Sequence, residues 1–148
     1  MVMIRPLAVS DKAQWRRLFE GYGEFYAMPL SDKTVETVWA WLNDPSHVLE
    51  GLVAQQDNDL AGMAHYRAMP SPLRGAEVGF LDDLYVDPTS RGTGAAKALL
   101  LHLQQIGRER GWQKIRWITA DDNYTARRLY DRVAVKMGWN LYEMSLGC

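Results

Sequence analysis

The sequence contains a single cysteine, Cys148, which is its last residue. One cysteine excludes an internal disulfide framework and a metal cluster built on several cysteines, and it is typical of a protein from a reducing compartment. Cys148 has no activating group near it in the sequence, so we expect a tail residue and not a nucleophile. We therefore expect a cytoplasmic protein.

The chain also lacks long apolar runs and a surplus of basic residues. No window approaches the roughly 20 apolar residues of a membrane span, and the N-terminus has no stretch typical of a signal peptide. The formal net charge is -1, which argues against the broad positive surface that neutralises nucleic-acid phosphates. His47, His65 and His102 are scattered without metal-ligand spacing. We expect a soluble protein with no metal and with neither a membrane nor a nucleic acid as partner.

What is present predicts one folded domain over residues 1–148. Of its 148 residues 47% are hydrophobic, which is enough for a core. Changes in hydrophobic period predict a mixed α and β chain with the order β, α, α, three strands, α, β, α, β. The expected strands are residues 3–7, 48–55, 60–67, 76–86, 114–119 and 139–145, with a loop at 69–75. The expected helices begin at Ser10, at Ser31, near Thr93 and at Asn123, and Gly111 closes the third.

A glycine-rich turn joins the strand at 76–86 to the helix that follows it. The first turn of a helix presents backbone N–H groups without internal partners, together with the positive end of the helix dipole. Gly92 and Gly94 have no Cβ atom and tolerate positive φ, so a pyrophosphate can approach this backbone closely. The turn matches neither the P-loop nor the dinucleotide-binding pattern. In the alternative interpretation, the two glycines only allow the strand to turn into the helix.

Two motifs give the chain a family resemblance. Arg91, Gly94 and Ala96 form R-x-x-G-x-A, which resembles the acyl-CoA signature [QR]-x-x-G-x-[GA] of the GNAT superfamily of N-acyltransferases. The run from Asn123 to Tyr130 resembles the N-x-x-A-x-x-x-Y element of the same superfamily. The resemblance covers nearly the whole chain and is nearest to small diamine, polyamine or D-amino-acid acetyltransferases. It implies an α/β GNAT fold with a central, mostly antiparallel sheet, flanking helices and a splayed CoA cleft.

The same resemblance implies how acetyl-CoA is bound. It places the pyrophosphate on the backbone of Arg91, Gly92, Thr93, Gly94, Ala95, Ala96 and Lys97. It pairs the pantetheine amides with the strand edge formed by Leu84, Tyr85 and Val86, where a backbone N–H would polarise the thioester carbonyl. Asn123 would be a further CoA contact, although as a helix N-cap it needs no other role.

Two adjacent acids and one phenol are the catalytic candidates. Asp82 and Asp83 interrupt an apolar strand, and a carboxylate there can take the proton of an ammonium group directly or through a water. Adjacent strand residues point to opposite faces unless a bulge re-aims one. The resemblance to the GNAT superfamily implies such a bulge in this strand. The segment also resembles the L-E-D-F/L-[FY]-V stretch of diamine and polyamine acetyltransferases, which puts Asp82 in the proton-removing position. Alternatively, the aspartates form caps or ion pairs.

Tyr130 is the candidate proton donor, because a phenol stays protonated at neutral pH and can protonate a departing thiolate. In the alternative interpretation it is an aromatic core residue. For the acceptor, Tyr22, Glu24 and Tyr26 combine acid and aromatic groups that suit a cationic amine, unless they simply end a helix.

These features predict transfer of an acetyl group from acetyl-CoA to a small primary amine, such as a polyamine, a diamine or an amino acid. Two alternatives are a protein or peptide amine as acceptor, and a sensor that binds acyl-CoA without transfer. The aromatic final strand, with Trp139 and Tyr142, is expected to form a homodimer contact.

Overall fold

A computed structural model describes residues 1–147; Cys148, expected to be an unreactive tail residue, lies outside the described residues. The chain forms two compact units that divide after Ile118. The first unit holds the sheet and three α-helices, and the second holds one.

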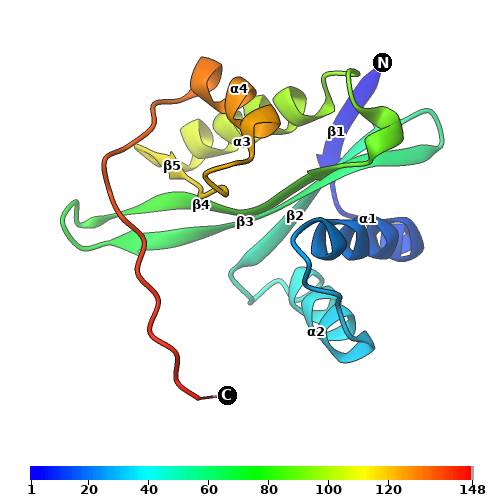
Figure 1. The fold of residues 1–148 in the computed structure, drawn as a ribbon, viewed down its shortest axis with the longest axis horizontal. Coiled ribbons are helices and arrows are strands. Elements are labelled where there is room, and N and C mark those ends of the chain that lie inside the picture. Colours follow the sequence, from blue (N-terminus) through cyan, green and yellow to red (C-terminus); the bar gives the residue numbers. More distant parts are fainter. Residues whose placement is uncertain (148) are drawn as a thin grey trace. The chain divides into compact units, whose positions relative to one another are not determined.

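The first unit is built on a five-stranded sheet with the order β1-β2-β3-β4-β5. The strands are β1 (Val2–Pro6), β2 (Leu49–Gln56), β3 (Asp59–Ser71), β4 (Ala76–Val86) and β5 (Ile115–Arg116). The first four pair antiparallel with their neighbours, and β5 runs parallel to β4 (Figure 1). The expected mostly antiparallel sheet is therefore confirmed.

Helices cover both faces of this sheet. The helices α1 (Lys12–Phe25) and α2 (Asp32–Leu42) lie on one face and α3 (Ala95–Arg110) lies on the other (Figure 1). Ser31 caps α2 by accepting a hydrogen bond from the N–H of Thr34, and Gly111 ends α3 with φ at 76°. Both ends agree with the expected caps. Within residues 1–147, no helix is long and apolar enough to cross a membrane.

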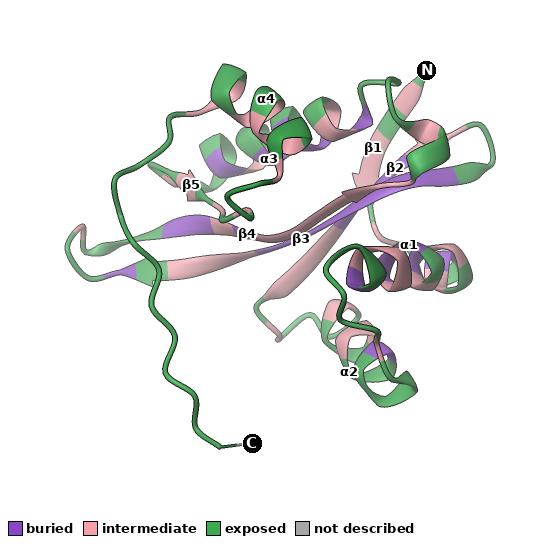
Figure 2. Cartoon of the chain, in the orientation of Figure 1, coloured by how far each residue is buried: buried purple, intermediate pink, exposed green. Residues whose placement is uncertain are grey.

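One hydrophobic cluster of the first unit lies between α1, α2 and the sheet, where the middle of the strands is buried (Figure 2), and α3 also buries apolar residues such as Leu99 and Leu103. The buried members of the cluster are Trp15, Leu18, Phe19, Val35, Val53, Leu60 and Met63. Burial of this apolar surface, worth about 25 cal/mol per Å², holds α1 against the sheet. The C-terminal half of α1 is thereby fixed beside β4, which carries Asp82 and Asp83, called the acid pair below.

Two expected boundaries were wrong. The loop expected at 69–75 begins later, because β3 continues to Ser71 through Pro70. The pairing of β3 with β2 ends at Arg67. Pro70 has no N–H to donate, and β2 no longer lies opposite it as an acceptor, so a proline is tolerated there. The strand expected at 114–119 is reduced to Ile115–Arg116, because β4 offers it partners only at Gly79 and Phe80.

The second unit contains α4 (Tyr124–Val133). Asn123 caps it as expected, since its Oδ1 accepts a hydrogen bond from the N–H of Ala126 at 3.3 Å. The strand expected at 139–145 was wrong: residues 135–147 form neither helix nor strand, and Trp139 and Tyr142 are 85% and 88% exposed. The apolar pattern suits a strand, but a strand forms only when a neighbouring backbone accepts its hydrogen bonds.

Candidate active site

The turn between β4 and α3 has an open face. Gly92 and Gly94 adopt φ of 85° and 83°, the left-handed conformation that favours glycine, and a Cβ built on either would meet no atom within 4 Å. Gly94 is the N-cap of α3 and supplies no side chain, so the N-terminus of the helix is not closed by a capping side chain. Exposed backbone N–H groups and open space above two glycines fit a pyrophosphate.

Asp87 fixes the chain where β4 enters this turn. Its carboxylate accepts hydrogen bonds from the hydroxyl and the N–H of Thr89 at 2.7 and 2.9 Å, and it pairs with Arg17 of α1. The Thr89 donors, with Arg17, hold the pKa of Asp87 below its ordinary value. Its own N–H donates to the carbonyl of Ala61 in β3 at 2.8 Å. The turn is therefore anchored to both α1 and the sheet.

The strand β4 has a free edge next to the turn. Its pairing with β5 covers only Gly79 and Phe80, so within residues 1–147 the edge from 81 to 86 faces no strand on the side of β5. An open backbone edge can pair with amide groups of a ligand. The residues that the resemblance assigns to the pantetheine amides, Leu84–Val86, lie in this stretch of β4.

A bulge in β4 brings both acidic side chains to one face. Asp83 pairs with His65 and Leu81 pairs with Tyr66, which leaves Asp82 as an extra residue between them. The Asp82 carboxylate contacts Arg67, and the Asp83 carboxylate contacts His65. Because these two β3 residues are two positions apart, they point to the same face. The bulge expected at the acid pair is thus present.

A buried chain of hydrogen bonds holds Asp83. The indole N–H of Trp15 donates to Nε2 of His65 at 2.9 Å, and Nδ1 of His65 lies 2.8 Å from Oδ2 of Asp83. An indole nitrogen is only a donor, so Nε2 is an acceptor and Nδ1 carries the proton. Because Nε2 accepts, the ring is a neutral donor to Asp83, and it is 1% exposed. Oδ1 of Asp83 has no hydrogen-bond partner in the described part of the chain.

Asp82 is held differently, by an ion pair. Nε of Arg67 donates to both of its oxygens, at 2.9 and 3.3 Å, and the guanidinium lies 4.9 Å from the centre of the Phe80 ring. The interpretation of the aspartates as ion-paired groups is therefore correct for Asp82. Asp83 keeps one oxygen available for a ligand.

The end of α1 brings one of the expected acceptor residues, Tyr22, to the acid pair. The hydroxyl of Tyr22 lies 3.5 Å from the backbone carbonyl of Asp82, and its ring packs edge-on against Tyr26 and Tyr85 at 5.0 and 6.2 Å. Burial raises the pKa of Tyr85, so this phenol is protonated at neutral pH. Glu24 faces a hollow of about 460 Å³ between α1 and the end of β4.

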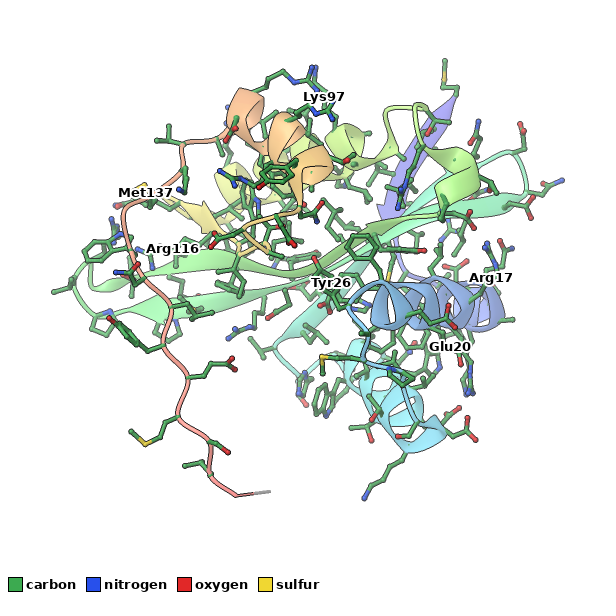
Figure 3. All side chains as sticks on the ribbon, viewed as in Figure 1. Arg17, Glu20, Tyr26, Lys97, Arg116 and Met137 are labelled. Carbon is green, nitrogen blue, oxygen red and sulfur yellow. The ribbon has the colours of Figure 1, made fainter. Side chains whose placement is uncertain are left out.

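The hollow is lined by charged groups from both elements. Arg17 and Glu20 project from α1, and Tyr26 lies at its end (Figure 3). Asp87 closes the hollow on the side of β4. Glu24 therefore lies with these charges, Tyr22 lies at the backbone of Asp82, and Tyr26 packs against Tyr22.

Two predicted site residues belong to the second unit. Asn123 and Tyr130 begin and nearly end α4, and Tyr130 lies one turn beyond Ala126, on the same face of the helix. Both are half-buried. Their roles as CoA contact and proton donor stay predictions. In the described residues, no group of three or more His, Cys, Asp or Glu side chains is placed to hold a metal ion.

Comparison with known proteins decides the family. Residues 15–134 match the Acetyltransferase (GNAT) family. The chain belongs to the GNAT family. It is 37% identical over 144 residues to glucosamine 6-phosphate N-acetyltransferase of Trypanosoma brucei brucei, covering 97% of this chain and 92% of that protein. It is 27% identical over 144 residues to the D-amino-acid N-acetyltransferase HPA3 of Saccharomyces cerevisiae, covering 96% and 89%.

A solved structure agrees with this placement. The crystal structure of ribosomal-protein-alanine N-acetyltransferase from Brucella melitensis biovar Abortus 2308 matches with a TM-score of 0.83 and 27% identity, over 99% of both chains. GNAT acetyltransferases use acetyl-CoA, and this GNAT protein is an N-acetyltransferase. The predicted family, fold and enzyme class are confirmed.

Three residues that the sequence did not predict as functional hold the acid pair: Arg67 contacts Asp82, His65 contacts Asp83, and Trp15 contacts His65. In the sequence, Trp15 has the pattern of a core residue, His65 is one of three scattered histidines, and Arg67 is the last residue of an expected strand. The available signal was the hairpin itself, since folding residues 60–86 back on each other brings His65 and Arg67 opposite the acids. In this GNAT protein they decide what each carboxylate contacts.

Proposed function

We propose that this protein transfers the acetyl group of acetyl-CoA to the primary amine of a small molecule. The observation that carries the proposal is the bulge of β4, which sets two carboxylates beside a free strand edge that leads directly into the open glycine turn. The named acceptors of two relatives, D-amino acids and glucosamine 6-phosphate, are small molecules with an amine.

In this proposal the cosubstrate lies along β4 and the turn. The backbone from Arg91 to Lys97 binds the pyrophosphate, and the edge from Leu84 to Val86 pairs with the pantetheine amides. An N–H of that edge polarises the thioester carbonyl. Asn123 contributes a further CoA contact. The thioester supplies the acyl group.

Asp83 is the better candidate to receive the proton of the amine, and Asp82 assists. Oδ2 of Asp83 is fixed by His65, which leaves Oδ1 for an ammonium group or for a water that relays its proton. The deprotonated nitrogen forms the C–N bond, the C–S bond breaks, and the thiolate takes the phenolic proton of Tyr130. The nitrogen loses its second proton as it becomes an amide, and that proton restores the phenol. Tyr22, Tyr26 and Glu24 line the approach of the amine and favour its positive charge.

The deciding experiment is the release of free CoA thiol from acetyl-CoA across a panel of polyamines, amino acids of both hands, amino sugars, aminoglycosides and lysine peptides. We expect turnover with at least one small amine. Turnover with lysine peptides alone would assign a protein acceptor instead. CoA binding without turnover on any acceptor would identify a sensor.

A variant separates the enzyme from the sensor. Tyr130→Phe removes one hydroxyl, so in an enzyme it lowers kcat and leaves the CoA affinity unchanged. A sensor would show no turnover before or after the change.

The proposal includes a homodimer. Residues 139–146 expose Trp139, Leu141, Tyr142, Met144 and Leu146, each at least 68% accessible. A run of exposed apolar side chains is unfavourable in water and suits an interface with a second copy.

A further inference from the structure

Arg67 offers a free cationic edge beside the acid pair. Its side chain is 37% exposed, and only its Nε is used, in the pair with Asp82. Packing against the Phe80 ring, 4.9 Å from the guanidinium carbon, holds the group in place. Within residues 1–147, Nη1 and Nη2 of Arg67 have no hydrogen-bond partner.

The free edge has the geometry of an oxyanion site. The two Nη groups of a guanidinium form a fork that matches a carboxylate or a phosphate with two parallel hydrogen bonds. The guanidinium cannot swing away without breaking its contacts with Asp82 and Phe80. A fork that is already oriented loses little side-chain entropy when it binds an anion.

Charges of both signs lie side by side around the two free Nη groups of Arg67. His65 is neutral, so the group consists of two carboxylates and one guanidinium. A cationic amine is attracted to Oδ1 of Asp83, and an anion is attracted to the fork of Arg67. A polyamine has no anion for this fork and brings a second cation towards it.

We propose that Arg67 binds an anionic group, carboxylate or phosphate, on the acceptor, so that the enzyme selects amines that carry such a group. This inference rests on the proposed function. Arg67 lies two residues along β3 from His65, the partner of Asp83. Two residues of strand span about 7 Å, so the anionic group lies within a few bonds of the amine.

Matched acceptor pairs test the inference. The first pair is an amino acid and its carboxamide, which differ by one charge, and the second is glucosamine 6-phosphate and glucosamine. We expect kcat/KM at least tenfold higher for the charged member of one pair, and the pair that responds shows whether a carboxylate or a phosphate is bound. The amine beside an amide has a pKa of about 8, lower than in the free amino acid, so ionisation alone favours the amide.

Variants connect any preference to Arg67. Arg67→Gln removes the fork and should raise KM for the charged acceptor by roughly ten- to a hundredfold, with little change for the neutral one. Arg67→Lys keeps the positive charge but has no paired Nη groups, so its KM for the charged acceptor should lie between the values of the wild type and of Arg67→Gln. Arg108→Gln, the same change at an exposed arginine at the end of α3, should leave KM unchanged for the charged and for the neutral acceptor.

The outcomes separate this inference from the proposed function. Equal or better turnover of both neutral acceptors by the wild type overturns the inference and leaves the acetyltransferase intact; this needs no variant to fold. A preference for the charged acceptor that survives in both Arg67 variants also overturns it. Absence of turnover with every acceptor, with CoA bound, overturns both.

Discussion

Asp82 and Asp83 are neighbours in the chain, yet their carboxylates have different surroundings. Both oxygens of Asp82 face the Nε of Arg67, whereas Asp83 is held through one oxygen by a neutral histidine. Oδ1 of Asp83 has no hydrogen-bond partner in the described part of the chain and can contact an amine, whereas neither oxygen of Asp82 is left without a partner. Because their contacts differ, two chemically identical carboxylates have separate roles.

This division predicts unequal effects of the same substitution. Asp83→Asn should lower kcat by about 10²- to 10³-fold, because it removes the group that accepts the proton. Asp82→Asn should lower kcat about tenfold or less. Steady-state kinetics with an accepted amine measures both, and unchanged CoA affinity shows that the cosubstrate site is intact. A larger loss in Asp82→Asn would reverse the two roles.

The sequence predicts that an acid pair lies at the site but not what holds each acid. Deciding which face each aspartate occupies requires the register of β3 against β4, including the extra residue at Asp82. A shift of one residue would turn His65 to the opposite face. The local signals for strands and turns do not fix that register, so Trp15, His65 and Arg67 could not be assigned from the sequence.

At the scale of elements, the glycine turn can be tested against a turn of equal strain. Gly94→Ala places a methyl group in the open space above the turn and holds alanine at φ of 83°. Gly75, in the turn between β3 and β4, also has positive φ, at 60°, and open space around it. Both variants should lose about 1–2 kcal/mol of stability. Only Gly94→Ala should weaken CoA binding, by at least tenfold in titration calorimetry; equal affinity in both would remove the pyrophosphate from this turn.

The junction of β1 with α1 makes stability depend on pH. Arg5 donates two hydrogen bonds to the buried Asp11, at 2.8 and 2.9 Å, and holds the pKa of that carboxyl below its ordinary value. A lowered pKa in the folded state stabilises the fold at pH values above the unfolded pKa of about 4, and this contribution is lost as the pH falls through the folded pKa.

Asp11→Asn should therefore lower the free energy of unfolding by about 2 kcal/mol at pH 7, measured by urea denaturation. The difference from the wild type should shrink as the pH falls below 4. Glu36→Gln, which breaks the exposed pair with Lys12, should cost less than about 1 kcal/mol at any pH. A difference between wild type and Asp11→Asn that is constant with pH would contradict the role of the charge.

Element boundaries follow from the sequence where local chemistry sets them. The strand expected at 76–86 matches β4, which lies between Gly75 and Pro88, and Ser31, Gly111 and Asn123 cap helices as predicted. Predictions failed where a distant partner decides. The strand expected at 114–119 shortened because β4 diverges from it, and the strand expected at 139–145 finds no partner among the described residues.

At the scale of the whole molecule, the exposed C-terminal segment predicts association of two copies. Its apolar side chains would lose contact with water if residues 139–146 packed against a second chain, so the wild type should be a dimer in light scattering at micromolar concentration. Trp139→Asp combined with Leu141→Asp introduces charges into that contact and should give a monomer. Leu73→Asp, at a 98% exposed position in the β3–β4 turn, is the control and should stay dimeric. A monomeric wild type would show that the segment does not join two copies.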